Sequence, residues 1–308
     1  MLTQLLRLVP RSMREAIIVR SVRFDEASVR GIEVKIAETV DELSSAARVV
    51  HDAYVGRGIM APHASGLKFC PQAVVPSSLT FVAKRDGNVL GTISLLADSP
   101  LGLPMDDTYG PEVNALRGRG ESCAEVSALA VSPGARRTGV SYLLNRIMVT
   151  AAIAMRLDRL VIAVHPDAQE LYRCASLFES LGPERQYVGL NRSARAVALS
   201  LPLDGLHARL AARFGHMGPV AQNPAHLHFE MPCPTIALPP GELGPSEARC
   251  DAYAVLARAR MDLFRTLTGK KLAFLKRSLP GVLWPSRSSD DWSREVAQCG
   301  FGAEGVQT

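Results

Sequence analysis

The stretch AEVSALAVSPGARRTGVSYLLNRI, residues 124–147, leads from an apolar run through a glycine-containing loop into a helical pattern. The apolar run stops at Ser132-Pro133-Gly134, and after two arginines the helical spacing begins near Gly139. Free N–H groups at the start of a helix attract anions, and arginine adds charge-assisted hydrogen bonds to phosphate. The pattern therefore predicts an anion-binding turn between a strand and a helix. An ordinary connection with solvated arginines is the alternative.

The segments around this stretch predict further strands and helices. Strands are expected at 32–39, in both halves of a hairpin spanning 79–97, and at 123–131, 159–165 and 194–203. Helices are expected at 41–58, from about Pro111, from near Gly139, and at 168–182. The strand, helix and strand between 123 and 165 normally form a right-handed parallel crossover, whereas a hairpin is antiparallel. The predicted fold class is therefore α/β, with an α+β type of mixed sheet.

Composition and the regularity of the apolar pattern divide the chain of 308 residues into three parts. We expect an N-terminal arm at 1–30, a main domain at 31–205, and a C-terminal extension at 206–308 that is partly helical and basic. With 47% apolar residues the chain has ample material for a buried core. The six cysteines are widely scattered, which is typical of reduced thiols in a cytoplasmic protein.

The net charge of +5 suits an anionic partner without identifying one. No block of like charges suggests a nucleic-acid partner, and no stretch approaches the roughly 20 apolar residues of a membrane span. Residues 245–277 read as a basic amphipathic helix, which suits peripheral contact with an anionic membrane or an acidic protein. The alternative is a helix that packs one face on the core. The expected location is cytoplasmic, with membrane association through this segment left open.

The loop after residue 131 has a counterpart in a known superfamily. Arg136-x-x-Gly139-x-Ser141 resembles the pyrophosphate-binding loop of the GCN5-related N-acetyltransferases (GNAT), with Ser141 where glycine or alanine is usual. The resemblance implies that the strands at 123–131 and 159–165 splay apart and that a pantetheine arm lies between them. The implied donor-binding residues are Val131, Arg136, Arg137, Thr138, Gly139, Val140 and Ser141.

A closer resemblance, covering about residues 32–205, is to the bacterial long-chain N-acyl amino acid synthases, which are relatives of acyl-homoserine-lactone synthases. It is carried by DSPLGLPMD at 98–106, by Ala124-Glu125-Val126-Ser127, and by VIAVHP at 161–166 with Leu171-Tyr172-Arg173. Arg48, Val50, Tyr54 and Gly58 in the first helix also match. The chain departs from the family at Ala128, where a basic residue is usual, and at His165, where asparagine is commoner.

The resemblance implies transfer of a long-chain acyl group from acyl carrier protein or CoA to the amino group of an amino acid. Glu125 would be the base, or a structural carboxylate; Tyr172 would protonate the leaving thiolate, or pack on the core. His165 would be a base or acceptor contact, or simply cap its strand. Ser127, Tyr54 and Met105 are assigned to substrate binding. Arg48 would reach the acceptor carboxylate, or remain solvated.

Two other functions fit the sequence less well. One is a non-catalytic module that binds an acyl carrier or a lipid, and the other is a short-chain N-acetyltransferase that uses acetyl-CoA. A deep apolar tunnel built from 59–81 and 98–112 would indicate a long acyl chain, and a closed one would indicate acetyl. We expect no metal and no redox cofactor, with acyl carrier protein or CoA thioester as the co-substrate. His226 and His228 could share one face of a strand, but no further metal ligand joins them.

Overall fold

The computed structural model describes residues 9–21, 24, 26–191, 194–218, 220, 222–230, 236–237, 246–282 and 284. Its centre is an eight-stranded mixed sheet in the order β6-β7-β5-β4-β3-β2-β1-β8. The strands are β1 (Glu33–Ile36), β2 (Leu79–Arg85), β3 (Asn88–Ala97), β4 (Cys123–Val131), β5 (Arg159–Val164), β6 (Glu179–Gln186), β7 (Arg195–Pro202) and β8 (Ile236–Ala237). This arrangement confirms the predicted fold class.

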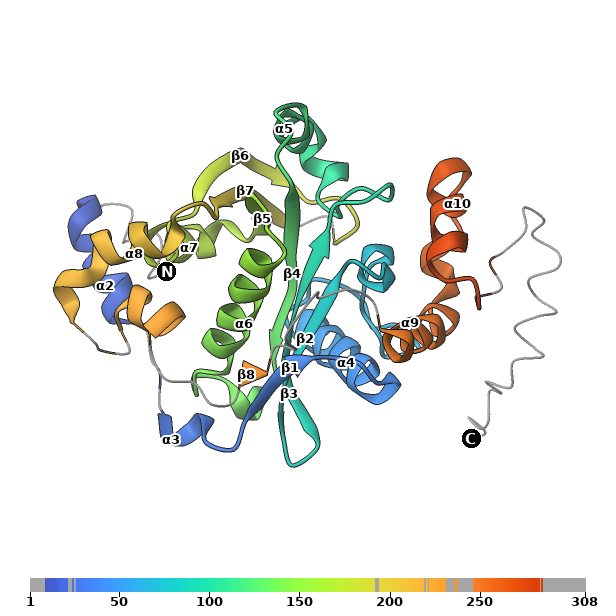
Figure 1. The fold of residues 1–308 in the computed structure, drawn as a ribbon, viewed down its shortest axis with the longest axis horizontal. Coiled ribbons are helices and arrows are strands. Elements are labelled where there is room, and N and C mark those ends of the chain that lie inside the picture. Colours follow the sequence, from blue (N-terminus) through green and yellow to red (C-terminus); the bar gives the residue numbers. More distant parts are fainter. Residues whose placement is uncertain are drawn as a thin grey trace.

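Helices cover both faces of the sheet (Figure 1). They are α2 (Arg11–Arg20), α3 (Glu26–Val29), α4 (Val40–Gly56), α5 (Asp106–Gly118), α6 (Val140–Ala154), α7 (Gln169–Ala175), α8 (Leu206–Phe214), α9 (Glu247–Ala259) and α10 (Gly269–Ser278). One face packs mainly against α6, and the other against α4. The C-terminal α9 lies against α4 and a short turn at Pro71–Val74, so it completes the second layer of the core.

Local sequence explains the ends of the elements that flank the site. Thr39 caps α4 by accepting a hydrogen bond from the Glu42 N–H at 3.2 Å, and the Glu42 carboxylate bonds back to Thr39. This capping box satisfies N–H groups that the first helical turn leaves unpaired. The β2–β3 hairpin turns at Asp86 and Gly87, which both have positive φ, as a two-residue hairpin turn requires.

The parallel pair β4 and β5 separates partway along its length. The two strands pair only from Cys123 to Glu125 in β4 and from Arg159 to Val161 in β5. Both strands continue beyond this point without pairing with each other. The strands are joined through α6, which confirms the predicted strand, helix and strand unit. It also confirms the predicted splay, which leaves one edge of β4 open from Val126 onward.

Several local predictions were wrong. The helix expected at 168–182 ends at Ala175, and residues 179–186 form β6 instead, paired with β7. The helix expected from Pro111 begins at Asp106, with a kink at Tyr109 that accommodates the proline. The basic stretch 245–277 is two helices, because Arg260 and Thr268 leave helical geometry.

The histidine pair was also misplaced by the sequence analysis. Residues 226–230 form a π-helical turn rather than a strand, and the His226 ring lies 3.4 Å from the Glu230 carboxylate. Within the described residues, no cluster of three or more histidine, cysteine or acidic side chains could hold a metal ion. No helix in that part of the chain is both long and apolar enough to cross a membrane.

Candidate active site

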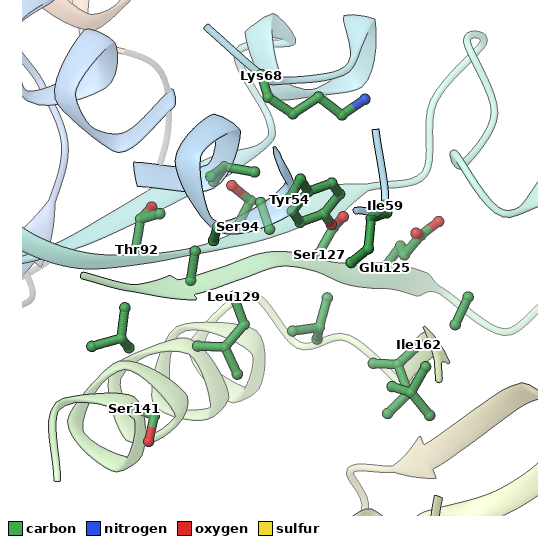
Figure 2. A pocket seen from close by; sticks show the side chains of 18 of the residues that line it. Tyr54, Ile59, Lys68, Thr92, Ser94, Glu125, Ser127, Leu129, Ser141 and Ile162 are labelled. Carbon is green, nitrogen blue, oxygen red and sulfur yellow. The ribbon is translucent and has the colours of Figure 1, made fainter. Parts of the chain in front are cut away.

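A cavity of about 610 Å³ opens at the point where β4 and β5 separate. It is bounded by β4 and β5, by the start of α6, by α4, and by the segment that follows α4. In Figure 2, β4 crosses the middle of the view, with Tyr54 and Lys68 on the α4 side and Ser141 on the α6 side. The cavity therefore extends along β4 on both faces of the sheet.

A β-bulge in β4 decides which side chains enter each side of the cavity. Thr92 pairs with Ala130 and Ser94 with Ser127, so Ala128 and Leu129 together oppose one residue of β3. Ala128 has a positive φ of 54°, as a bulged residue can have. The extra residue shifts the alternation of side chains. Glu125 and Ser127 consequently point to the α4 side, while Leu129 points to the α6 side (Figure 2).

Glu125 lies where the β4–β5 pairing ends, and only 3% of its surface is exposed. The Met105 N–H donates a hydrogen bond to its carboxyl oxygen at 2.8 Å. Burial raises the pKa of Glu125 to about 8; the Met105 bond works against this rise, and Asp106 adds to it. The site thus holds a carboxyl that exchanges its proton near neutral pH, which suits a general base. Met105 itself is fully buried and acts through its backbone.

Three further titratable side chains surround Glu125. Tyr54, Cys70 and Tyr187 line the cavity, and burial is the main cause that raises the pKa of each. Each also responds to the charge of Glu125, which places all three near its carboxyl. At neutral pH these groups are uncharged, so Glu125 sits among neutral hydroxyl and thiol groups.

Tyr172 and His165 reach the cavity from the other side of the splay. Tyr172 lines the cavity and packs edge-on against Phe178 with ring centroids 5.6 Å apart, and burial raises its pKa. His165 also lines the cavity, but its side chain is 65% exposed. Its Nδ1 accepts the Asp167 N–H at 3.2 Å, so it caps the turn after β5.

The loop from β4 into α6, where the sequence predicts an anion site, borders the cavity. Arg136 and Arg137 line the cavity and are exposed, and Arg137 has a positive φ of 64°. Gly139 caps α6 with a φ of 107°, and a Cβ there would lie 2.7 Å from the Phe24 ring. Thr138 turns its hydroxyl inward to the Ala135 carbonyl at 2.7 Å. The remaining predicted donor residues, Val131, Val140 and Ser141, line the cavity.

Two cations lie on the α4 side of the cavity. Lys68 and Arg57 both line it, and no hydrogen bond or ion pair to either side chain is found among the described residues. Burial lowers the pKa of the half-buried Lys68, as does Arg260, while Cys70 raises it. The charge of Arg57 opposes part of the rise that burial causes in the pKa of Tyr54 and Tyr172. Arg48, in contrast, is exposed on α4 and does not border the cavity.

An apolar chamber extends from this region beneath α4. It is lined by Leu43, Ala46, Ala47, Val50, Ala73, Leu96 and Leu256. The hydroxyls along its sheet wall are already paired: Thr80 with Ser94 at 3.1 Å, and Thr92 with the Phe81 carbonyl at 2.9 Å. The chamber thus offers apolar surface and satisfied hydroxyls, which suits a hydrocarbon chain.

The structure brings most of the predicted residues together. The cavity is shared by the loop from β4 into α6 and by Glu125, Tyr172, His165, Tyr54 and Ser127. The sequence analysis did not assign the lining residues Arg57, Lys68, Cys70 and Tyr187, whose charge or titration bears on the site. Arg57 follows Tyr54 by three positions on one helix face, a signal that could have found it. The other three lie outside α4 and the paired strands, in segments whose path no periodicity predicts.

Comparison with known proteins identifies relatives of this site. The family model described as N-acyl amino acid synthase FeeM matches residues 45–202. The structure of FeeM, an N-acyl amino acid synthase from uncultured soil microbes, shows 27% identity and a TM-score of 0.53. The match covers 59% of this chain and 97% of that one.

More distant structures also match. An acyl-CoA N-acyltransferase from Pseudomonas aeruginosa has 16% identity and a TM-score of 0.38, covering 55% of this chain and 98% of that one. The CoA-dependent acyl-homoserine lactone synthase BjaI has 16% identity and a TM-score of 0.44, covering 75% and 100%. None of the curated proteins searched matches this chain.

Proposed function

The chain belongs to the FeeM family of N-acyl amino acid synthases and is an N-acyltransferase, and we propose that it transfers a long-chain fatty acyl group to the amino group of an amino acid. The donor is a thioester on acyl carrier protein or CoA. The observation that carries the proposal is the position of Glu125. This carboxyl has a pKa of about 8 and lies where the open edge of β4 meets the apolar chamber.

The donor is placed by the splay and the loop that follows it. The unpaired edge of β4 beyond Glu125 offers backbone groups to an extended pantetheine arm, as a sheet edge does to an added strand. Arg136, Arg137 and the free N–H groups at the start of α6 then face its phosphate. The acyl chain continues past Glu125 into the apolar chamber, whose apolar lining suits a hydrocarbon chain longer than acetyl.

The reaction needs one proton to pass from the amine to the leaving sulfur. The amine nitrogen attacks the thioester carbonyl carbon while Glu125 takes an amine proton, directly or through water. The edge of β4 that does not pair with β5 beyond Glu125 would present backbone N–H groups to the oxyanion. The C–S bond then breaks, leaving an amide on the amino acid. Tyr172 gives its proton to the departing thiolate and regains one from water, and Glu125 releases its proton to water. No metal or redox group takes part in these steps.

Arg57 and Lys68 are proposed to bind the acceptor's carboxylate. Both cations line the cavity. Lys68 lies on the same side of β4 as Glu125 (Figure 2), and Arg57 directly follows α4. An α-amino acid carries its carboxylate one carbon from the reacting nitrogen, so a cation near Glu125 orients the amine for attack. Arg48, which the sequence had suggested for this role, lies on the exposed side of α4.

The test compares Lys68→Met with Arg48→Gln as a matched control for removal of one positive charge. We expect Lys68→Met to raise KM for the amino acid by about ten-fold or more, with KM for the acyl donor unchanged. Arg48→Gln should behave like the wild type. In the wild type, an amine of the same structure without the carboxylate should react less well than the amino acid. This difference between the two acceptors should disappear in Lys68→Met. An unchanged KM in Lys68→Met, or a loss in Arg48→Gln instead, would refute this acceptor site.

The exposed basic residues of α10 are proposed to contact an acidic acyl carrier protein. Lys270, Lys271, Lys276 and Arg277 are all exposed on this helix. The test measures the turnover rate with the same acyl chain carried either by acyl carrier protein or by CoA. Replacing Lys276 and Arg277 by glutamate should weaken only the reaction with carrier protein, and more at low salt. Equal loss with both donors would contradict carrier docking, and binding of the wild type to anionic vesicles would favour membrane contact instead.

A further inference from the structure

We propose that α9 forms the far wall of the acyl chamber and that Leu256 sets the length of the acyl chain the enzyme accepts. Leu256 lines the cavity and is only 4% exposed. It belongs to a helix that lies outside residues 45–202, the part of the chain that the family model matches. The inference rests on the proposed function, because it takes the chamber to hold the acyl group.

The position of α9 is held by buried polar contacts as well as by packing. Tyr253 donates a hydrogen bond to the Ser78 carbonyl at 3.1 Å, directly before β2. The buried Arg260 donates to the Leu67 carbonyl and forms a two-pronged ion pair with Asp262. The Tyr253 and Arg260 bonds tie the middle and the C-terminal end of α9 to residues before β2, so its inner face is a fixed wall.

The residues that line the chamber explain why Leu256 is the position to vary. Ala46 and Ala47 of α4 and Ala73 of the turn before β2 are small and leave room for a ligand. The larger lining residues Leu43, Val50 and Leu96 belong to α4 and β3. Among the described residues of α9, Leu256 is the one that lines the chamber, so its size determines how far a hydrocarbon chain can extend toward this helix.

The test measures kcat/KM over a series of acyl donors that lengthen by two carbons at a time. Leu256→Ala should shift the preferred donor to a longer chain, and Leu256→Phe to a shorter one. Each methylene newly buried or excluded should change relative kcat/KM by about four-fold. Val255→Ala is the matched control, because Val255 is the neighbouring residue of α9 and is 39% exposed; its chain-length profile should equal that of the wild type.

Activity with the shortest donor that the wild type accepts reports whether each variant is folded, because that chain does not reach Leu256. Opposite shifts in Leu256→Ala and Leu256→Phe support the inference. If both variants stay active with the short donor and keep the wild-type profile, Leu256 is not the wall and the inference is wrong. If the wild type itself transfers no chain longer than acetyl, the proposed long-chain function fails, whatever the variants show.

Discussion

The role proposed for Glu125 depends on surroundings that raise the pKa of its carboxyl to about 8. A carboxyl in water ionises near pH 4.5, but burial among Tyr54, Cys70 and Tyr187 raises the pKa of Glu125 to about 8. The single N–H bond from Met105 offsets only part of the desolvation. A base of this strength can take a proton from an ammonium group and return it within one catalytic cycle.

Replacing Glu125 by glutamine tests this role, because it exchanges one carboxyl oxygen for an amide nitrogen. The variant keeps the shape and can still accept the Met105 N–H through its amide oxygen, but it cannot take a proton. We expect kcat to fall by about 10²- to 10⁴-fold, with binding of the acyl donor unchanged. Pre-steady-state measurement of donor binding and turnover checks both. Wild-type turnover in Glu125→Gln would eliminate Glu125 as the base.

The pKa itself can be observed. In the wild type the protonated carboxyl of Glu125 should persist at pH 7 and disappear as the pH rises through about 8. Difference infrared spectroscopy follows the C=O stretch of a protonated carboxyl, and Glu125→Gln identifies the band by its loss. A carboxyl already ionised at pH 6 would mean that the site is more polar than its burial indicates.

At the scale of elements, the connection from β4 to α6 depends on Gly139. Its φ of 107° is costly for any other residue, and the Phe24 ring occupies the space where a Cβ would lie. This glycine therefore fixes how the first turn of α6 faces the cavity. The Phe24 ring thus lies directly beside this turn.

Gly139→Ala should destabilise the fold by about 1–3 kcal/mol and weaken donor binding, because the loop must shift to relieve both strains. Gly134→Ala, in the same loop, is the control: its φ is not positive and nothing lies within 4 Å of a Cβ there. Thermal unfolding and donor KM measure the two effects. Equal behaviour of the two variants would show that the loop is not held by Gly139.

The sequence predicted those elements whose pattern is local. The spacing in 124–147 predicted the ends of β4 and the start of α6 to within two residues, and Asp86-Gly87 predicted the position of the hairpin turn. β6 was missed because Gly182-Pro183 lies within a run that also has helical spacing, and pairing with β7 prevails over that local preference. The start of α5 was missed because Asp106 precedes a proline that the kink at Tyr109 accommodates.

At the scale of the whole molecule, the C-terminal helices are built into the second layer of the core. Tyr253, Phe264 and Leu275 are fully buried in the same cluster as Leu43 of α4. The site needs this assembly, because α9 covers the chamber from outside the main domain. No single-sequence pattern could place Leu256 or Lys68 in the cavity, since their neighbours come from distant parts of the chain.

The two tryptophans of the chain allow the cooperativity of this assembly to be measured. Trp284 packs against Phe264 with ring centroids 5.1 Å apart, and Trp292, outside the described residues, also belongs to the C-terminal extension. Unfolding followed by tryptophan fluorescence should coincide with unfolding followed by far-ultraviolet circular dichroism. Tyr253→Phe should move both transitions together, by about 1–2 kcal/mol. Separate transitions would show that the extension folds independently of the main domain.

The most direct test of the central claim is mass spectrometry of lipids from cells that make the wild-type protein, beside cells that make Glu125→Gln. We predict a new N-acyl amino acid with the wild type alone, whose mass gives the acyl chain and the acceptor together. The absence of any such product, with free fatty acid recovered from the purified wild-type protein, would contradict catalysis and indicate a lipid-binding protein.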